Sequence, residues 1–342
     1  NAAYTRGPLK LGQLVSWVEP EMLYSRIQTR QASIALVETG KDGFPVLFLH
    51  GNSSSSDVFA RQLESPLAER HRLIALDLPG HGASDDAIEP KAAYTIPGFA
   101  NTVAEVLDAL AIDHVAVVGW SLGGHIGIEL LEREPRIAGL MIMGTPPVSR
   151  GILGMLRGFQ PQFDLTLTTK GRLTPREMDR LARLCFGESP PQRFRDAIAR
   201  ADWRMRKILG YGLMMGAGAD QKKVVEHSPV PLAVVNGERE PFARLDYLTG
   251  LDYANLWDGQ CHLINAAGHA AFLDAPGEFN ALLGRFIEDA AAFACEYGGG
   301  HRVDLGAVWT EEKVEFRFGC VHEGIARNDA FSHGAIIDAH QA

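Results

Sequence analysis

Cysteine and long apolar runs are both scarce in this 342-residue sequence. The four cysteines, Cys185, Cys261, Cys295 and Cys320, are scattered and form no C-x-x-C pair. This pattern indicates free thiols in a reducing, cytoplasmic compartment, with a single disulfide as the alternative. No apolar run reaches the roughly 18 residues of a membrane span, and none near the N-terminus leads to a small-residue cleavage site. The sequence therefore predicts no membrane span and no secretory signal.

Metal-ligand motifs are missing as well. No H-x-H-x-D-H cluster occurs, and the histidines towards the C-terminus lack tight ligand spacing. These histidines are His301, His322, His333 and His340. We therefore expect no bound metal and no cofactor.

The net charge of −9 is unevenly distributed along the chain. Residues 150–223 hold 15 Lys and Arg against 7 Asp and Glu, a balance of +8. A basic segment can attract anions, but no aromatic residues are interleaved with these charges and no nucleic-acid-binding motif occurs. We interpret the charges as solvated helix faces and expect no nucleic-acid partner.

Short apolar runs alternate along the chain with segments of helical periodicity. Several runs are continuous in Val, Ile and Leu, which is typical of parallel strands covered on both faces. The predicted strands are Ser33 to Glu38, Pro45 to His50, Arg72 to Leu78, His114 to Trp120, Gly139 to Thr145 and Pro231 to Asn236. Helical spacing covers Gly98 to Leu110 and Leu122 to Glu134, and Pro135 fits the end of the second helix. This alternation predicts an α/β fold with a mostly parallel central sheet flanked by helices.

The alternation breaks between about Thr145 and Ser228, where the sequence is helical and poor in strands. We interpret residues 146–228 as an inserted helical cap over the C-terminal edge of the sheet, where ligands of open α/β sheets bind. The predicted core then comprises residues 22–145 and 229–295.

The two ends of the chain differ from the rest. Residues 1–21 have no clear period and precede Met22, where a start codon would sit, so we expect an N-terminal extension. Residues 296–342 form the expected C-terminal extension, flexible or appended, in which the alternation from Val314 to Phe318 allows a short strand or hairpin. We assign neither extension a catalytic role.

Gly119-Trp120-Ser121-Leu122-Gly123 follows an apolar strand and opens a helix. This is the G-x-S-x-G nucleophile elbow in the strand–turn–helix context that the motif requires. The sharp turn needs small residues on both sides of the serine, and it exposes the serine oxygen at a helix N-terminus, which favours negative charge. Ser121 is therefore the predicted nucleophile.

A serine hydroxyl needs a base to take its proton. An elbow of this kind is followed along the chain by an acid and then by a histidine on a late loop. His269, within Ala267 to Phe272, has that place and is the predicted base. His262 is the alternative, although its place in the preceding strand favours a packing role.

The acid should follow the strand that ends at Asn236 and should orient the histidine. Glu240 is the candidate in this loop, where aspartate is more usual. We expect its neighbour Glu238 at the surface, and Asp246 and Asp252 are less favoured because they lie further downstream.

The loop from His50 to Ser56 follows a strand and is predicted to supply one oxyanion-hole N–H, from Asn52. Leu122, the residue after the nucleophile, should supply the second donor. We interpret Asp77 to Gly82 as architectural because it precedes the elbow, and His125 as a packed helix residue.

Seven segments together resemble one enzyme family: HGNSSSS, DLPGHGAS, GWSLGGHIGIE, GTPPV, AVVNGEREPF, NLWDG and AGHAAF. From about Met22 to Cys295 the chain is similar to the α/β-hydrolase-fold N-acylhomoserine lactonases, which are metal-independent quorum-quenching enzymes. HGNS and GWSLGG are shared with many esterases, whereas HIGIE, GTPPV and the glutamate in NGEREPF are more specific.

The resemblance implies the α/β-hydrolase fold, a triad of Ser121, Glu240 and His269, and an oxyanion hole of Asn52 and Leu122. The implied reaction opens the ring of an N-acylhomoserine lactone. Ser121 would attack the lactone carbonyl, and water activated by His269 would release an N-acylhomoserine from the acyl-enzyme.

Leu181 stands where relatives in this family place a tyrosine near the substrate tunnel, which implies altered recognition of the amide or lactone. The expected substrate contacts are Asn52, Trp120, Met155, Phe159, Leu181, Met214 and Phe242. With Leu156, Phe163, Leu213 and Met215, the apolar cap residues among them are expected to line an acyl-chain tunnel, and ordinary cap packing is the alternative.

Two other functions stay open on the sequence alone. The first is a general carboxylesterase or C–C bond hydrolase that uses the same three residues. The second is a ligand receptor that keeps the triad but does not turn over. Haloalkane dehalogenases and epoxide hydrolases are disfavoured because they carry aspartate at the elbow, where this chain has Ser121.

Overall fold

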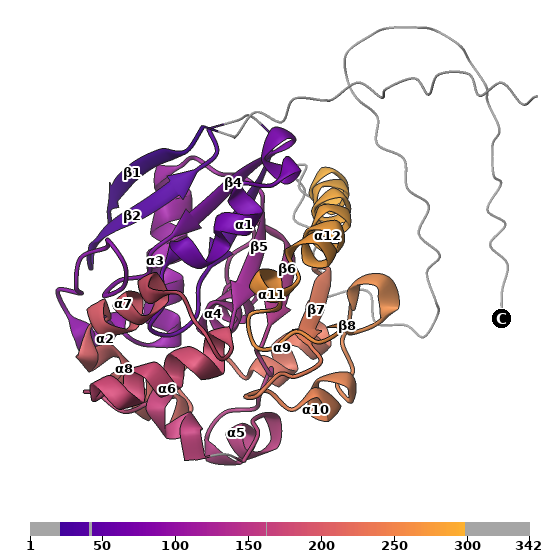
Figure 1. Ribbon diagram of the computed structural model, residues 1–342. Coiled ribbons are helices and arrows are strands. Elements are labelled where there is room, and N and C mark those ends of the chain that lie inside the picture. The colour runs from indigo at the N-terminus through magenta and orange to yellow at the C-terminus, as the bar shows by residue number, and fades with distance from the viewer. Residues whose placement is uncertain (1–20, 41–42, 162, 298–342) are drawn as a thin grey trace, which may run out of the picture. The chain divides into compact units, whose positions relative to one another are not determined.

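The computed structural model describes residues 21–40, 43–161 and 163–297. Within these residues the sheet has eight strands in the order β1-β2-β4-β3-β5-β6-β7-β8 (Figure 1). The β1–β2 and β2–β4 pairs are antiparallel, and all pairs from β4 to β8 are parallel. The strands are β1 Leu23–Gln28, β2 Ser33–Glu38, β3 Phe44–Leu49, β4 His71–Leu76, β5 Val115–Trp120, β6 Ile137–Met143, β7 Leu232–Gly237 and β8 His262–Ile264. The prediction of a mostly parallel sheet is confirmed.

The six predicted strands correspond to β2 through β7, with every boundary within two residues. No pattern in the sequence predicted β1, which lies at the edge of the sheet and is mostly exposed. An exposed edge strand lacks the buried apolar residues that reveal a strand in a sequence. Arg26 of β1 instead makes polar contacts, donating to Ser33 Oγ at 3.0 Å and to Asp85 Oδ1 at 2.6 Å.

Helices cover both faces of the sheet. The α-helices are α1 Ala60–Leu63, α2 Pro90–Ala93, α3 Ile96–Ala109, α4 Leu122–Leu131, α5 Ile152–Gly158, α6 Pro175–Phe186, α7 Gln192–Arg200, α8 Trp203–Met214, α9 Gln221–His227, α10 Leu245–Thr249, α11 Ala271–Asp274 and α12 Pro276–Tyr297. The 3₁₀ helices are η1 Ser56–Phe59, η2 Pro66–Glu69, η3 Phe163–Thr168 and η4 Trp257–Gly259. The predicted helices over 98–110 and 122–134 correspond to α3 and α4, and α4 ends before Pro135.

Neighbouring residues of β5 pack into two hydrophobic clusters on opposite faces of the sheet. Val117 packs in the cluster that contains Phe99 of α3 and Ile126 of α4. Val118 packs in a second cluster with Phe286 of α12. Burial on both faces explains why β5 reads as a continuous apolar run, and it places α3 and α4 on one side of the sheet and α12 on the other.

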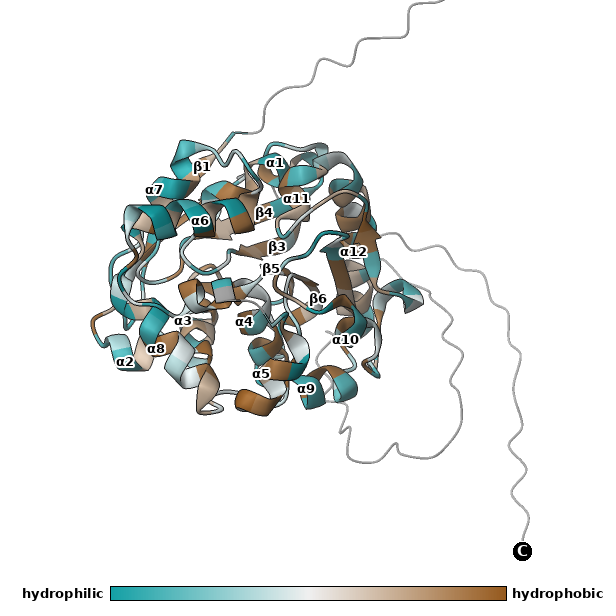
Figure 2. Cartoon of the chain, turned by 60° about the horizontal axis from the view of Figure 1, so that its bottom comes forward, coloured by the Kyte–Doolittle hydropathy of each residue, from teal (hydrophilic) through white to brown (hydrophobic). Residues whose placement is uncertain are grey.

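Five α-helices, α5 to α9, and the 3₁₀ helix η3 are inserted between β6 and β7, and α5 to α8 lie towards one end of the sheet in Figure 1. α6 begins with a capping box, in which Thr174 and Glu177 satisfy each other's backbone N–H groups. Its buried Leu181 and Ala182 join a small apolar cluster with Ile198 of α7. The outer faces of α6 and α7 are polar, as the teal colour in Figure 2 shows.

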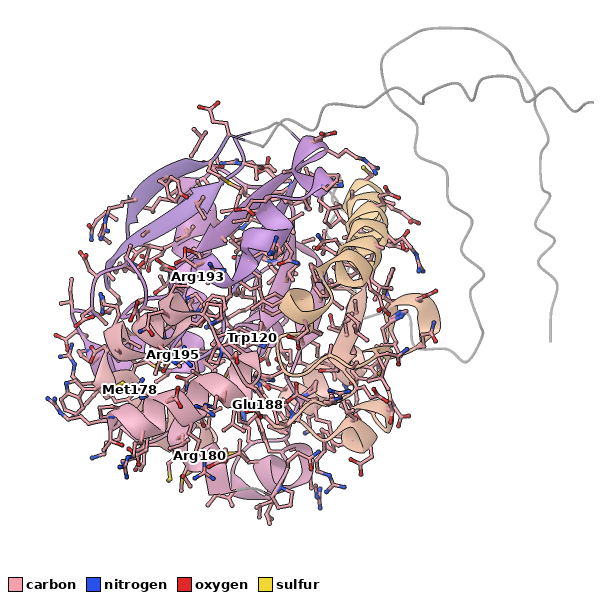
Figure 3. The ribbon with its side chains drawn as sticks, viewed as in Figure 1. Trp120, Met178, Arg180, Glu188, Arg193 and Arg195 are labelled. Carbon is pink, nitrogen blue, oxygen red and sulfur yellow. The ribbon has the colours of Figure 1, made fainter. Side chains whose placement is uncertain are left out.

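Most charged residues of these helices fit the expected solvated faces. Arg180 and Arg195, labelled in Figure 3, pair with Asp164 at 2.7 Å and with Asp179 at 3.0 Å. Arg206 departs from the expectation because it is only 2% exposed. An amphipathic pattern does not distinguish a solvated arginine from one that is drawn inward by backbone carbonyls.

The predicted extensions lie outside the described residues, apart from residue 21 and residues 296–297. Cys185 and Cys261 are free thiols, and Cys320 is outside the described part of the chain. Across residues 21–40, 43–161 and 163–297, none of the helices combines the length and the apolar character that crossing a bilayer demands.

Candidate active site

Ser121 occupies the turn between β5 and α4. Its backbone angles are φ 53° and ψ −112°, an unusual conformation for a residue with a side chain. Close packing forces this turn: a Cβ at Gly119 would lie 2.5 Å from the Gly123 carbonyl oxygen, and one at Gly123 would lie 1.9 Å from the Leu49 carbonyl oxygen. The glycines are therefore required by sterics, and they leave the Ser121 side chain facing a cavity.

His269 and Glu240 form a buried pair, with side chains 2% and 0% exposed. The imidazole Nδ1 lies 2.8 Å from Oε2 and 3.0 Å from Oε1 of Glu240. Oε1 also accepts hydrogen bonds from the backbone N–H groups of Phe242 at 2.7 Å and Ala243 at 3.1 Å. A carboxylate can only accept, so this geometry places the imidazole proton on Nδ1 and leaves Nε2 as the basic nitrogen.

The loop after β7 keeps Glu240 ionised. Burial by itself raises the pKa of Glu240, but the charge of His269 and the hydrogen bonds from His269, Phe242 and Ala243 outweigh burial. The pKa of this carboxyl is consequently held below its usual value. The carboxylate is suited to orient an imidazole and to stabilise its charged form.

The alternative candidates for the base and the acid do not form a buried pair like that of His269 and Glu240. Glu238 is exposed, and its carboxylate accepts from the Ala266 N–H at 3.1 Å. His262 packs against Trp257 with ring centroids 5.1 Å apart. His125 of α4 is bonded through Nδ1 to Gln221 Oε1 at 2.7 Å, and burial lowers its pKa to about 4. His125 also borders the cavity, where it is a neutral wall residue.

Trp120 links the serine turn to the histidine loop. Its indole Nε1 donates to the His269 carbonyl oxygen at 2.9 Å, and the two rings lie 5.2 Å apart. Trp120 is labelled in Figure 3 close to the cap helices. Ser121 and His269 both line the cavity, with Glu240 behind the imidazole.

The segment Asp77 to Gly82 supports the loop after β3. Asp77 Oδ1 accepts from the Ser56 N–H at 2.7 Å, and His81 Nε2 accepts from the Ser53 N–H at 3.2 Å. His50 Nε2 in turn accepts from the Leu78 N–H at 3.0 Å. These bonds agree with the architectural interpretation, because they fix the loop that carries Asn52.

Asn52 and Leu122 both border the cavity beside Ser121. Leu122 is the first residue of α4, and the first N–H groups of a helix have no acceptor within it. The Asn52 side chain has internal partners: Nδ2 donates to the Thr168 carbonyl oxygen at 2.9 Å, and Oδ1 accepts from Ser53 Oγ at 2.7 Å. Its backbone, rather than its amide group, is therefore the part suited to face a substrate.

The cavity has a volume of about 540 Å³, within the usual range for small-molecule sites. All seven predicted substrate contacts line it, together with Leu156 and Leu213. Met215 does not line it and is instead 67% exposed, and the side chain of Phe163 lies outside the described residues. Lining residues that the sequence did not reveal include Ile152, Gln160, Pro161, Leu165, Thr166, Thr168, Thr169, Cys185 and Leu209. Their positions depend on how the cap docks, and no local motif marks them.

Comparison with known proteins decides the family. The sequence model described as the alpha/beta hydrolase fold matches residues 45–276, more than half of the chain. The chain belongs to the α/β-hydrolase family. Among solved structures, it resembles N-acyl homoserine lactonase AidH complexed with N-butanoyl homoserine, with 43% identity and a TM-score of 0.76. That match covers 78% of this chain and 97% of AidH.

More distant α/β hydrolases also match. A 2-hydroxymuconate semialdehyde hydrolase of Pseudomonas sp. (strain CF600) is 28% identical over 266 residues, covering 74% of this chain and 89% of the relative. A pimeloyl-[acyl-carrier protein] methyl ester esterase of Xanthomonas axonopodis pv. citri (strain 306) is 29% identical over 253 residues, covering 72% of this chain and 95% of the relative. The lactonase and esterase relatives support a hydrolase that acts on ester bonds.

Proposed function

We propose that this α/β hydrolase opens the lactone ring of N-acylhomoserine lactones and yields N-acylhomoserines, the reaction of a quorum-quenching enzyme. The similarity to AidH, at 42–43% identity over 78–79% of the chain, carries the proposal. A serine-to-glycine mutant of AidH is complexed with the closed N-hexanoyl homoserine lactone, and AidH itself with the open N-butanoyl homoserine. Both ligands are small enough for a cavity of about 540 Å³.

In the proposed first step, Ser121 Oγ adds to the lactone carbonyl carbon while His269 Nε2 takes its proton. The carbonyl oxygen becomes an oxyanion, for which the Asn52 and Leu122 backbone N–H groups are the proposed donors. Glu240 holds the imidazolium through Nδ1–H. The tetrahedral intermediate then collapses by breaking the ring C–O bond, and the alkoxide takes the proton from His269.

The proposed second step releases the product. The leaving hydroxyl remains part of the acyl group on Ser121, because the bond that breaks lies within a ring. A water molecule gives a proton to His269 and attacks the ester carbonyl carbon. The resulting tetrahedral intermediate carries a second oxyanion, which the same Asn52 and Leu122 N–H groups would stabilise. Ser121 recovers its proton from the imidazolium, and the N-acylhomoserine forms as a carboxylic acid that loses its proton to solvent and leaves as the carboxylate.

The two sides of the cavity suit the two parts of such a substrate. The lactone would lie against Ser121 and His269, near the threonines Thr168 and Thr169. The acyl chain would lie against the apolar side chains of α5 and α8, which include Met155. Methionine side chains are flexible and adapt to chains of varied length.

The mass of the product tests this proposal. N-hexanoyl homoserine lactone should gain one water with its acyl chain retained, whereas release of hexanoic acid would indicate an amide hydrolase. Ser121→Ala should remove almost all of the activity, and a chelator should leave it unchanged. An unaltered lactone after prolonged incubation with folded protein would contradict the proposal and would favour a receptor.

A general esterase or C–C bond hydrolase is the second candidate, favoured by the match to the 2-hydroxymuconate semialdehyde hydrolase. The three triad residues would serve either chemistry. Comparing kcat/KM on N-hexanoyl homoserine lactone and on p-nitrophenyl hexanoate separates the candidates, because only a lactonase should prefer the lactone. Incubation with a 2-hydroxymuconate semialdehyde tests the C–C reaction in the same way.

A further inference from the structure

Arg206 of α8 is a buried cation without a carboxylate partner among the described ion pairs. Its guanidinium donates from Nη1 to Ser53 Oγ at 2.7 Å. It also donates from Nη2 to the Gly171 carbonyl oxygen at 2.8 Å and from Nε to the Lys170 carbonyl oxygen at 3.0 Å. Burial lowers the pKa of Arg206, and the charge of Asp202, which forms no ion pair with it, offsets this only in part. Burying a charge without a directly paired carboxylate is costly, so a chain that needed only packing here would be served better by an apolar residue.

These contacts close a ring of hydrogen bonds between the cap and the loop after β3. Ser53 Oγ, which accepts from Arg206, donates to Asn52 Oδ1 at 2.7 Å. Asn52 Nδ2 donates to the Thr168 carbonyl oxygen at 2.9 Å. Thr168 lies two residues before Lys170, and Arg206 donates to the Lys170 carbonyl oxygen. Arg206 and Asn52 therefore bind the same cap segment.

The ring fixes the backbone next to Asn52. Ser53 has φ 58°, in the left-handed region that residues with side chains seldom adopt. Its N–H donates to His81 Nε2 at 3.2 Å, and its hydroxyl is held on one side by Arg206 and on the other by Asn52. A strained conformation persists only where its surroundings determine it.

The start of α8 is itself anchored to the core. The Asp202 N–H donates to the Gly80 carbonyl oxygen at 2.8 Å, and Asp202 Oδ2 accepts from the Tyr94 hydroxyl at 2.7 Å. Arg206 follows one helical turn later, so its guanidinium has a defined place relative to the loop that carries Asn52.

We propose that Arg206 is a positioning residue for the oxyanion hole, which it sets by holding Ser53 and thereby the backbone of Asn52. The proposal rests on the proposed function, in which the Asn52 N–H stabilises the oxyanion. It makes the efficiency of the chemical step depend on a cap residue that does not line the cavity.

Two variants test this role. Arg206→Met removes the charge and the donors, and Ser53→Gly removes the hydroxyl at a φ that glycine adopts without strain. We expect each to lower kcat on N-hexanoyl homoserine lactone about ten- to a hundredfold with KM within threefold, somewhat less than the loss of a whole oxyanion donor. Lys207→Met, which removes an exposed charge from the same helix, should keep the kcat of the unmodified protein.

A tetrahedral mimic separates positioning from simple stabilisation. An alkyl trifluoromethyl ketone accepts the serine oxygen at its carbonyl carbon and becomes an oxyanion while the serine proton passes to the histidine. The affinity for this ketone should fall together with kcat in both variants. The double variant should lose no more affinity than the single variant with the larger loss, because both substitutions act on one network. A purely structural role would lower the melting temperature and leave the affinity of the folded fraction unchanged.

The outcomes distinguish this inference from the proposed function. Unchanged kcat and mimic affinity in Ser53→Gly would overturn the role of Arg206, even if Arg206→Met failed to fold. If, in the same assays, Ser121→Ala retained turnover, the proposed function itself would fail. A rise in KM with kcat preserved in both variants would also contradict positioning and would assign Arg206 to substrate binding.

Discussion

The cavity is lined by core residues such as Ser121 and His269 and by cap residues such as Met155 and Leu213, and the two groups are held by different kinds of structure. The core side consists of loops at the ends of parallel strands, where hydrogen bonds and close backbone packing fix each group. The cap side consists of helices that contribute apolar side chains. Hydrogen bonds and steric contacts specify positions closely, whereas apolar packing specifies a volume.

This comparison teaches where tolerance to change should lie. A substitution in the core loops displaces a group whose atoms must meet a reacting carbonyl. A substitution in the cap changes the shape of the cavity wall, along which the acyl chain lies in the proposed function. We therefore expect core changes to act mainly on kcat and cap changes to act on the choice of substrate.

Ser121→Ala should have the largest effect and tests whether core substitutions change turnover without changing binding. Removing the nucleophile of a triad can cost about a millionfold in turnover. The cap wall is untouched, so the variant should still bind N-hexanoyl homoserine lactone, as isothermal titration calorimetry can measure. Loss of binding along with turnover would show that core and cap are not separable in this way.

Glu240→Gln probes the core loop after β7. The amide can no longer stabilise the imidazolium and can hold the wrong tautomer, for which losses of about ten-thousandfold in kcat are known in triads. Glu238→Gln is the matched control, because this glutamate is in the same loop and is exposed. Similar kcat values for the two variants would remove Glu240 from the proposed mechanism.

Leu213→Trp tests the cap side. An indole in the cavity should exclude long acyl chains, and overpacking of about 1–3 kcal/mol corresponds to roughly a five- to 140-fold loss. We expect kcat/KM on an N-dodecanoyl lactone to fall by this factor, and that on an N-butanoyl lactone by less than threefold. Leu153→Trp is the control, since Leu153 is 73% exposed and does not line the cavity. An equal loss on both substrates would contradict a separate acyl wall.

The smallest predicted effect concerns the pH dependence of stability, which we expect His125 to influence. Its pKa is about 4 in the folded protein, because burial disfavours the charged form, against 6.5 when unfolded. Below pH 6.5 the unfolded chain binds the additional proton, so stability should fall as the pH drops from 6.5 towards 4, by up to about 3 kcal/mol. His125→Gln should flatten this part of the pH dependence of Tm.

The matched control for that pH dependence is His227→Gln, because His227 is an exposed histidine. This substitution should leave the slope of Tm against pH unchanged. If His125→Gln and His227→Gln gave the same slope as the unmodified protein, burial of the His125 imidazole would not govern acid stability.

The core side could be predicted from the sequence because local rules act there. Gly119 and Gly123 are demanded by backbone contacts within a few residues, so the elbow is visible as a motif. Glu240 follows from its place after a strand, and the exposure of Glu238 agrees with the expectation for that residue. The edge strand β1 was missed because its side chains are mostly exposed.

The cap side could be predicted only in outline. Apolar residues such as Phe159 were expected to line a tunnel, and most of them line the cavity, whereas Met215 does not. Thr168 and Cys185 were not expected, because their places depend on contacts between segments far apart in the chain. The buried Arg206 was missed for the same reason, since its carbonyl partners lie about 35 residues before it in the sequence.

The most direct measurement of the central claim is covalent labelling of the nucleophile. A fluorophosphonate should add once to the intact protein, and peptide mapping should place the adduct on Ser121. N-hexanoyl homoserine lactone should slow the labelling, and His269→Gln should nearly abolish it, because the serine oxygen would lose its base. An adduct on another residue, or undiminished labelling of Ser121 in His269→Gln, would contradict the account.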